Sequence, residues 1–582
     1  MIKKEDFGKF FDQEAEAAKK SWDALMKLPI KQRIRKRKAI ESVYLDKGFR
    51  GSTPDNYVLL KLAVGTNLSD FKEGEYLVLH RETSTSSVQC VLNKFEGDDV
   101  IFIEVFPANM PTDLSNYYDI PLIIDRDYVD LRQHVYSNFL CKLPVEEDFW
   151  NNTILNTKQT PTYDKIDEAR KELDDTVKNF KLNLLTKQKE AILNSMAARD
   201  YYLIQGPPGT GKSFTLGLII LEEVYYYKHK VIVIGPNHLA INNTLEQALK
   251  LAPMTLLKVG QSYNSANIKV QHDENEYMIY NIPKLNVSNI VNYKEGIAIG
   301  LTPHSLYTSR ARGLECDTLI IDEAGQMSLP LTMMGIIKAK RIIFAGDHKQ
   351  LPPIIESDNI SDDLKKSAFE TLISKENCTM LDISFRMCEP ICNFVSDLFY
   401  NGELKSMKHG YGNLITCDDP LLSYHVPVVI LNVNDNGEQT SDLEALAICE
   451  IIDGYIKKGL VSSEIAILSP FRAQAANIRR HLKKKVMVND NDRAQISIDT
   501  IDKMQGQERE VIIFSLAAGD MDYMLEMADF LYSPQKLNVA FSRAKSKLII
   551  VGNIGNLENI SDQDFPHIKE MIESKHAVRM DY

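Results

Sequence analysis

The chain has 582 residues, a length that predicts three or four domains. Its hydrophobic fraction of 44% and charged fraction of 25% are typical of a soluble globular protein, and no apolar run reaches the roughly 18 residues that a membrane span needs. The net charge of −12 argues against a protein that coats nucleic acid by bulk positive charge, although it leaves room for a basic groove on an acidic body. Eight scattered cysteines without paired CxxC spacing favour free thiols over a metal cluster, so we expect a reducing, cytoplasmic setting.

The front of the chain, residues 1–50, is polar and rich in Ala, Lys and Glu, and it predicts one or two helices. It contains a basic run, Lys31-Gln-Arg-Ile-Arg-Lys-Arg-Lys38, for which three interpretations stay open. The run is a solvated helix face, a contact for phosphate groups, or a nuclear-targeting signal.

Residues 51–125 change to a strand-like pattern. Short apolar runs separated by Gly, Asp, Ser and Asn predict a small antiparallel β-barrel with strands at 58–64, 76–80, 88–92 and 100–105. Residues 126–181 again favour helices. Because helical segments flank the barrel on both sides, we expect an insertion carried on a stalk, with 1–50 as its first part and 126–181 as its return part.

From Tyr201 onward, buried strand-like runs alternate with helical stretches, a pattern that predicts an α/β fold with parallel sheets. The strands fall into two sets, one at 231–234, 296–300, 318–321 and 341–345, the other at 427–431, 465–468, 511–514 and 548–551. We therefore expect two tandem α/β domains, over residues 182–370 and 371–582.

Residues 206–213 directly follow an apolar run and have the strand–loop–helix context of a phosphate-binding loop. Glycines let backbone N–H groups surround a phosphate, Lys212 adds a positive charge, and the Ser213 hydroxyl is suited to Mg²⁺. The chain is thus expected to bind a nucleoside triphosphate and Mg²⁺. The predicted contacts in this loop are Gly206, Pro207, Pro208, Gly209, Thr210, Gly211, Lys212 and Ser213.

Acidic and amide side chains follow further strands of the first set. Asp322 ends a buried run and is expected to hold Mg²⁺ with Ser213, while Glu323 would polarise an attacking water. Gln350 follows the next strand, where it could sense a terminal phosphate. Gln188, upstream of the loop, has the two-sided amide that can read an adenine edge. The alternative for Asp322 and Glu323 is a strand-end turn with exposed acids, and an isolated Gln188 would be a surface residue. The phosphate-binding loop favours the catalytic interpretation.

The second domain offers groups suited to the other side of a nucleotide. Arg386 has a planar fork for phosphate oxygens, and its neighbour Phe385 has a flat ring that could stack on a base. Arg543 lies on a predicted helix, Gly506 permits close backbone approach, and Glu508 could accept hydrogen bonds from a ribose. For either arginine alone, a structural salt bridge is the default alternative.

Taken in order, these segments resemble the motifs of superfamily 1B helicases of the nonsense-mediated-decay and immunoglobulin-mu-binding-protein type. The resemblance spans about residues 184–553, and its matching segments are Gln188, 206–213, 322–326, 346–353, Phe385-Arg386, 469–474, 500–508 and 537–544. It implies two RecA-like domains that grip ATP between them, with a helical stalk and a small barrel at the front. His238 stands where the family usually has Asn, which puts the strand contact there in doubt.

The resemblance also implies roles for individual residues. Lys212, Asp322, Glu323 and Gln350 would act from the first sheet, and Arg386 and Arg543 would act as arginine fingers from the second, with Phe385 stacked on adenine. Movement along the strand would run 5′ to 3′. The implied contacts to nucleic acid are Pro236, Asn237, Thr302, Pro303, Pro470 and Thr500.

The leading hypothesis is an ATP-dependent helicase that translocates on single-stranded DNA or RNA, as a monomer, with room for a regulatory protein partner and no membrane. The alternative is a strand-stimulated ATPase or translocase that remodels protein–nucleic-acid complexes without unwinding naked duplex. A non-hydrolysing scaffold is disfavoured because the catalytic set is intact. The sequence leaves the choice between DNA and RNA open.

Overall fold

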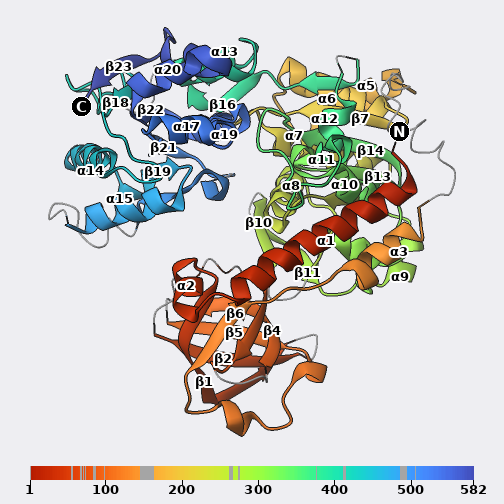
Figure 1. Cartoon of the computed structure of the whole chain (residues 1–582). Helices are drawn as coiled ribbons and strands as arrows, with labels where there is room; N and C mark the ends of the chain where they lie inside the picture. The colour runs from red at the N-terminus through yellow and green to blue at the C-terminus, as the bar shows by residue number, and fades with distance from the viewer. Residues whose placement is uncertain are drawn as a thin grey trace.

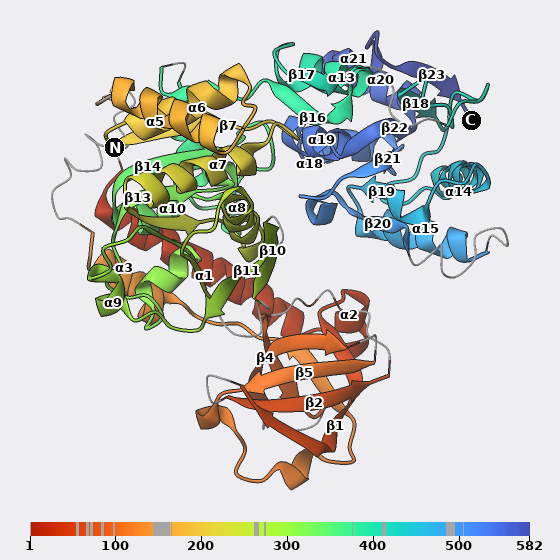
Figure 2. The ribbon, with the colours of Figure 1, turned by 180° about the vertical axis from the view of Figure 1, so that it is seen from behind.

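The computed structural model comprises a β-barrel and two α/β domains, and helix α1 runs from the first α/β domain down to the barrel (Figures 1 and 2). Within the described part of the chain, none of the helices combines the length and apolar character that a membrane crossing requires. The described residues are 2–53, 57–65, 69, 71, 74–82, 87–96, 99–143, 163–164, 166–260, 267–272, 275–374, 376–409, 415–484, 495–504 and 506–582.

The stalk is anchored at both ends by aromatic side chains of α1. Near its start, the Phe11 ring stacks on Tyr136 with ring centroids 3.9 Å apart, inside the core of the first α/β domain. Near its end, Trp22 Nε1 donates a hydrogen bond of 2.8 Å to the carbonyl of Arg126 in the last barrel strand. The helices of this part are α1 (Lys4–Met26), α2 (Ile30–Arg35), the π-helical η3 (Arg132–Tyr136) and α3 (Ser137–Leu140).

The barrel is closed and antiparallel, with strand order β1-β2-β5-β4-β3-β6. The expectation that residues 1–50 are all helical is wrong for residues 39–50, because β1 begins at Ala39 and places Val43 and Leu45 in the barrel core. The strands are β1 (Ala39–Ser52), β2 (Val58–Val64), β3 (Tyr76–His80), β4 (Ser87–Glu96), β5 (Val100–Val105) and β6 (Leu122–Arg126), with 3₁₀ turns η1 (Pro107–Asn109) and η2 (Leu114–Tyr117).

The first α/β domain is built on a sheet of order β10-β11-β9-β12-β8-β13-β14-β7-β15, parallel except for the β10–β11 hairpin. Its strands are β7 (Tyr201–Gln205), β8 (Lys230–Ile234), β9 (Leu256–Val259), β10 (Ile268–His272), β11 (Asn275–Ile282), β12 (Ile297–Gly300), β13 (Cys316–Ile321), β14 (Ala339–Gly346) and β15 (Cys378–Met380). Its helices are α5 (Ile166–Asn179), α6 (Thr186–Ala197), α7 (Lys212–Leu221), η4 (Glu222–Tyr226), α8 (His238–Leu251), α9 (Val287–Val291), η6 (Pro303–Tyr307), η7 (Ala324–Gln326), α10 (Leu329–Ile336), α11 (Asp362–Lys365) and α12 (Ala368–Leu372).

The first α/β domain extends beyond the expected boundaries, residues 182–370, at both ends. Helix α5, assigned from the sequence to the returning stalk, buries Ala169 and Leu173 in the core of the first sheet. Strand β15 lies beyond residue 370 and pairs in parallel with β7. Both segments join the domain through tertiary contacts that residue patterns do not reveal.

The second α/β domain has a fully parallel sheet of order β20-β19-β21-β22-β18-β23 and a separate pair, β16 and β17. The expected α/β class with two tandem RecA-like domains, a stalk and a small barrel is therefore confirmed. The strands are β16 (Ile383–Cys388), β17 (Lys405–Lys408), β18 (Val428–Asn432), β19 (Ile465–Ser469), β20 (Ser497–Thr500), β21 (Arg509–Ser515), β22 (Ala544–Gly552) and β23 (Val578–Asp581). The helices are α13 (Glu389–Phe399), α14 (Asp442–Lys457), η8 (Ser462–Glu464), α15 (Arg472–Lys484), η9 (Ile501–Met504), α17 (Met521–Glu526), α18 (Ala528–Leu531), α19 (Pro534–Phe541), α20 (Ile554–Asp564) and α21 (Pro566–Ile572).

Candidate active site

The phosphate-binding loop connects β7 to α7 at the carboxyl edge of the first sheet. Gly209 and Gly211 have φ of 75° and 82°, the left-handed region where glycine is favoured. A Cβ atom at Gly209 would lie only 2.5 Å from Cβ of Arg386, so the loop is in close contact with the second domain. The first turn of α7 directs its free N–H groups into the same space, which suits an anion.

Lys212 is the centre of a charged cluster beneath this loop. Its Nζ lies 3.0 Å from Asp322 Oδ1 and 2.6 Å from Glu323 Oε1. Burial lowers the pKa of Lys212, but the two carboxylates outweigh burial and raise it overall. Burial also opposes ionisation of Glu323, yet Lys212 holds the pKa of that carboxyl below its usual range. Lys212 and Glu323 are therefore both charged in this structure.

The two carboxylates are held in place by other side chains. Thr244 Oγ1 donates to Asp322 Oδ2 at 2.7 Å, and Gln326 Nε2 donates to Glu323 Oε2 at 2.7 Å. Glu323 has φ of 55°, a left-handed conformation that is unusual for a side chain of its size. The hydrogen bonds and the strained backbone aim Glu323 into the cleft.

The residues around the loop fit a nucleoside triphosphate with a divalent cation. The left-handed Gly209 and Gly211 let backbone N–H groups of the loop face a phosphate, and Lys212 with the α7 N-terminus supplies positive charge. Ser213 is half-buried in the first turn of α7, one residue after Lys212, which itself contacts Asp322. A hydroxyl and a carboxylate are oxygen ligands of the kind that Mg²⁺ prefers.

Strand β16 of the second domain lies directly on the loop. Ser384 Oγ donates to the carbonyl of Pro208 at 2.9 Å, and the Phe385 N–H donates to the carbonyl of Gly209 at 2.8 Å. The Phe385 ring is 42% exposed, so one face is available to stack on a base. Phe385 is therefore placed beside the phosphate-binding loop, and its stacking on adenine stays a prediction.

Gln188 also lies against the loop, on the first domain. A Cβ atom at Gly211 would lie 3.0 Å from Gln188 Nε2 and 4.0 Å from a ring carbon of Phe385, so these two side chains flank the same position. The Gln188 amide accepts a hydrogen bond from Leu185 N at 3.1 Å and donates to the carbonyl of Thr210 at 3.4 Å. Its amide thus supports the loop conformation in this structure.

The arginines of the second domain face the first-domain site. Arg543 Nη2 donates to Gln350 Oε1 at 3.3 Å, and Arg386 Nε donates to Glu508 Oε2 at 2.6 Å. Arg543 is not on a helix as expected, because α19 ends at Phe541 and Arg543 lies in the turn before β22. Burial, and then the neighbouring Arg386, lower the pKa of the Arg543 guanidinium. Arg543 is buried and its charge lowers the pKa of Glu323, the partner of Lys212, so the second domain adds positive charge to a site suited to a polyanion.

Glu508 pairs with cations of its own domain, and Gly506 lines a hollow between the domains. Glu508 accepts from Arg386 and also pairs with Lys545 at 3.3 Å. Burial opposes its ionisation, but Arg386 and Lys545 lower its pKa overall. Gly506, with φ of 80°, lines the hollow that also contains Glu323, and a Cβ atom there would lie 3.8 Å from Leu239 of the first domain.

A buried hydrogen-bond network that the sequence did not predict joins the two domains beside Gln350. Tyr400 OH, from the end of α13, donates to Asp347 Oδ2 at 2.5 Å, and Gln350 Nε2 donates to the same oxygen at 2.8 Å. Asn538 Nδ2 donates to Tyr400 OH at 2.8 Å and to the carbonyl of Lys349 at 2.7 Å. Asp347 and Asn538 lie within the quoted motif segments, but no sequence signal marks Tyr400.

Some of the expected nucleic-acid contacts meet in one hollow of about 770 Å³. Its lining includes Asn237 after β8, Thr500 at the end of β20, and Glu323 of the nucleotide site. Asn237 caps α8 by accepting a hydrogen bond from Ala240 N at 3.0 Å. The other expected contacts, which are Pro236, Thr302, Pro303 and Pro470, follow neighbouring strands but are not part of this lining.

His238, which departs from the family pattern, is half-buried at the start of α8. Burial lowers its pKa to about 4, with additional contributions from Lys258 and Arg310. The imidazole is therefore neutral at physiological pH. It contributes a neutral polar group to this region, as the family's usual Asn would.

Comparisons with known proteins agree with this architecture. Two AAA domain family models match, over residues 188–356 and 364–555, one on each α/β domain. An uncharacterized ATP-dependent helicase of Methanocaldococcus jannaschii is 29% identical over 66% of this chain and 69% of its own length. The DNA polymerase alpha-associated DNA helicase A of Schizosaccharomyces pombe is 25% identical over 76% of this chain and 73% of its own length. The ATP-dependent helicase NAM7 of Saccharomyces cerevisiae is 25% identical over 65% of this chain and 42% of its own length.

The two AAA domain matches and the named ATP-dependent helicases show a chain similar to helicases of the superfamily 1B type. It is accordingly an ATP-hydrolysing helicase enzyme, as the motif order predicted. Among solved structures, the arterivirus nonstructural protein 10 helicase is 13% identical with a TM-score of 0.40, covering 90% of this helicase and 79% of that chain. That similarity is too low to support a conclusion about individual residues.

Proposed function

We propose that this helicase translocates 5′ to 3′ on single-stranded nucleic acid and couples each movement to ATP hydrolysis between its two RecA-like domains. One observation carries the proposal: Glu323, the candidate general base, lines the same hollow as Asn237 and Thr500. A strand that crosses the two sheets there would contact the residue positioned to activate water. The direction of movement rests on the family resemblance.

The proposed nucleotide contacts follow from the charged cluster beneath the loop. ATP, when bound, supplies a phosphoanhydride bond whose hydrolysis drives movement. Lys212 and the loop N–H groups would hold its phosphates, and Ser213 and Asp322 would hold Mg²⁺. Phosphate oxygens would compete with Glu323 for Lys212, and the freed Glu323 carboxylate would then accept a proton from water.

The second domain would complete the site from the other side. Arg386 and Arg543 would stabilise negative charge that develops on the phosphates, as arginine fingers do. Gln350, which already accepts from Arg543, would link the state of the site to the contact between the domains. Opening and closing of this contact would move the strand across the two sheets.

The test compares ATP hydrolysis by the purified chain alone, with single-stranded DNA, and with single-stranded RNA of equal length. We expect at least one of the two strands to stimulate hydrolysis. In Glu323→Gln the strand-stimulated rate should be lower by about 10²-fold or more. The exposed Glu573→Gln is the matched control. Duplexes with a 5′ or a 3′ overhang then measure strand displacement and its direction.

Each outcome has a definite meaning. Hydrolysis that no strand stimulates, or that survives in Glu323→Gln, would overturn the proposal. Stimulation without displacement of naked duplex would favour the alternative, a motor that remodels protein–nucleic-acid complexes. Stimulation by one of the two strands but not the other would identify the substrate.

A further inference from the structure

The basic run at the front of the chain divides into a structural part and an exposed part. Arg33 is buried and pairs with Asp125, which is fully buried in the barrel. The residues that follow are Arg35 and Lys36, both exposed, and Arg37 and Lys38, both half-buried. Helix α2 thus fixes the turn to the barrel through Arg33 and presents consecutive positive charges where the stalk enters β1.

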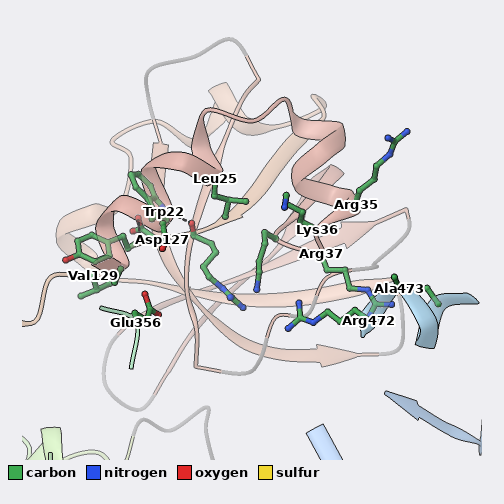
Figure 3. A pocket seen from close by; sticks show the side chains of 16 residues that line it. Trp22, Leu25, Arg35, Lys36, Arg37, Asp127, Val129, Glu356, Arg472 and Ala473 are labelled. Carbon is green, nitrogen blue, oxygen red and sulfur yellow. Dashed lines mark hydrogen bonds between the residues drawn. The ribbon is translucent and has the colours of Figure 1, made fainter. Parts of the chain in front are cut away.

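These charges line a hollow of about 1050 Å³ between the stalk, the barrel and the second RecA-like domain. Figure 3 shows Arg35, Lys36 and Arg37 of the turn and Arg472 of the second domain around one opening. The charged lining residues are the cations Arg35, Lys36, Arg37, Lys38, Arg126 and Arg472 and the carboxylates Asp127 and Glu356. A local excess of cations on a chain of net charge −12 calls for a physical reason.

The positive charge of Arg37 acts on α15 of the second domain. Burial chiefly, and Arg37 in addition, lower the pKa of Arg479 on α15, although Asp499 raises it. Arg37 and Arg479 come from different domains, so bringing them together costs energy that an anion between them would offset. The hollow itself is lined by six cations and two carboxylates, and one of the cations, Arg126, also pairs with Glu75 at 2.8 Å. Its remaining excess of positive charge suits an anionic ligand.

The hollow also continues into the proposed strand path. Lys38, Arg126 and Arg472 line both this hollow and the neighbouring one that contains Asn237 and Thr500. A chain of phosphates that leaves the two sheets on this side would meet the basic turn next. Small-molecule anions would not need a groove that extends in this way.

We propose that the basic turn, Arg35–Lys38, together with Arg126 and Arg472, binds the sugar–phosphate backbone of the nucleic-acid strand beyond the part that crosses the two sheets. The inference rests on the proposed function, because it extends the same strand path. Guanidinium and ammonium groups bind phosphates without reading bases, so the contact is independent of sequence. This contact would keep the strand bound to the enzyme while the two RecA-like domains in turn release and rebind it.

Arg37 offers a variant that does not endanger folding. It has φ of 61°, and its N–H and that of Lys38 bond to the carbonyls of Ile34 and Arg33, a helix end at which glycine is preferred. Arg37→Gly therefore removes the charge while relieving the backbone. Lys181 ends α5 in the same way, with φ of 51° and an exposed side chain away from the hollow, so Lys181→Gly is the matched control.

The experiment measures the affinity of the full chain for fluorescent single strands of increasing length at several salt concentrations. We expect Arg37→Gly to melt at the same or a higher temperature than the unaltered chain and to bind long strands several-fold more weakly. The steepness of its log affinity against log salt should decrease by about 0.7 for each phosphate that the variant no longer neutralises. Strands too short to leave the two sheets should bind both variants alike.

Two results would overturn this inference while leaving the proposed function intact. One is equal affinity and salt slope for Arg37→Gly and Lys181→Gly on long strands. The other is an effect of Arg37→Gly that is the same at every strand length. If the unaltered chain binds no strand at all, the proposed function itself fails and this inference fails with it.

Discussion

The hydroxyl of Tyr400 is expected to stabilise the closed arrangement of the two RecA-like domains. It joins the second domain to Asp347 of the first through a buried bond of 2.5 Å, and Tyr400→Phe removes it with almost no change in shape. A hydrogen bond to a charged group contributes about 1.5–3 kcal/mol. Asp347 keeps hydrogen bonds from Gln205 and Gln350, so the lower end of this range applies.

A loss of about 1.5 kcal/mol makes the ratio of closed to open molecules roughly tenfold smaller, and the closed population falls by the same factor where the open state predominates. If hydrolysis requires Arg543 beside Gln350, kcat with a saturating strand should fall by a similar factor. Tyr455→Phe is the matched control, because its hydroxyl bonds the carbonyl of Leu421 at 2.8 Å entirely within the second domain. The comparison isolates the bond between domains from the general cost of losing a buried hydroxyl.

The assay is steady-state ATP hydrolysis at saturating ATP and strand, together with the melting temperature of each variant. We expect both variants to melt at slightly lower temperatures and only Tyr400→Phe to lose kcat. Equal kcat values for the two variants would refute the argument, since the bond between domains would then have no part in the active arrangement.

Two further variants test the cleft and the second domain. Arg543→Lys keeps the charge but loses the fork that reaches Gln350 and the carbonyl of Val539, so kcat should fall at least about tenfold while the surface control Arg579→Lys stays unchanged. A decrease confined to KM for ATP would contradict that role. Glu444 is buried and its pKa is raised to about 8, above the ordinary value of 4.5, so the folded chain binds a proton there that the unfolded chain releases. The contribution of Glu444 to the free energy of unfolding is fully present below about pH 4.5. It decreases by about 1.4 kcal/mol per pH unit as the pH rises toward 8. Urea midpoints at pH 6 and pH 8 should therefore fall more in the unaltered chain than in Glu444→Gln, and parallel shifts in the two proteins would show the assignment to be wrong.

Much of the fold was predictable because its signals are local. The buried strands at 231–234, 318–321, 465–468 and 511–514 are continuous apolar runs, and all of them form strands of the two sheets. Strand β1 was missed because a polar, basic stretch precedes it. Its alternation of buried and exposed residues is apparent only in the closed barrel.

The sequence by itself determined the class of the molecule and its nucleotide chemistry. The glycine-rich loop, the strand that ends in Asp322 and Glu323, and the segments around the two arginines are each short stretches of consecutive residues. Such a stretch indicates its chemistry without knowledge of the tertiary structure. The tertiary structure alone decided which distant groups meet. Tyr400 with Asp347, and Arg37 with the α15 side of the second domain, lie far apart in the chain and come together only through packing of whole domains. Residue patterns report local conformation, whereas such contacts depend on how domains are oriented, so no single segment of sequence contains them.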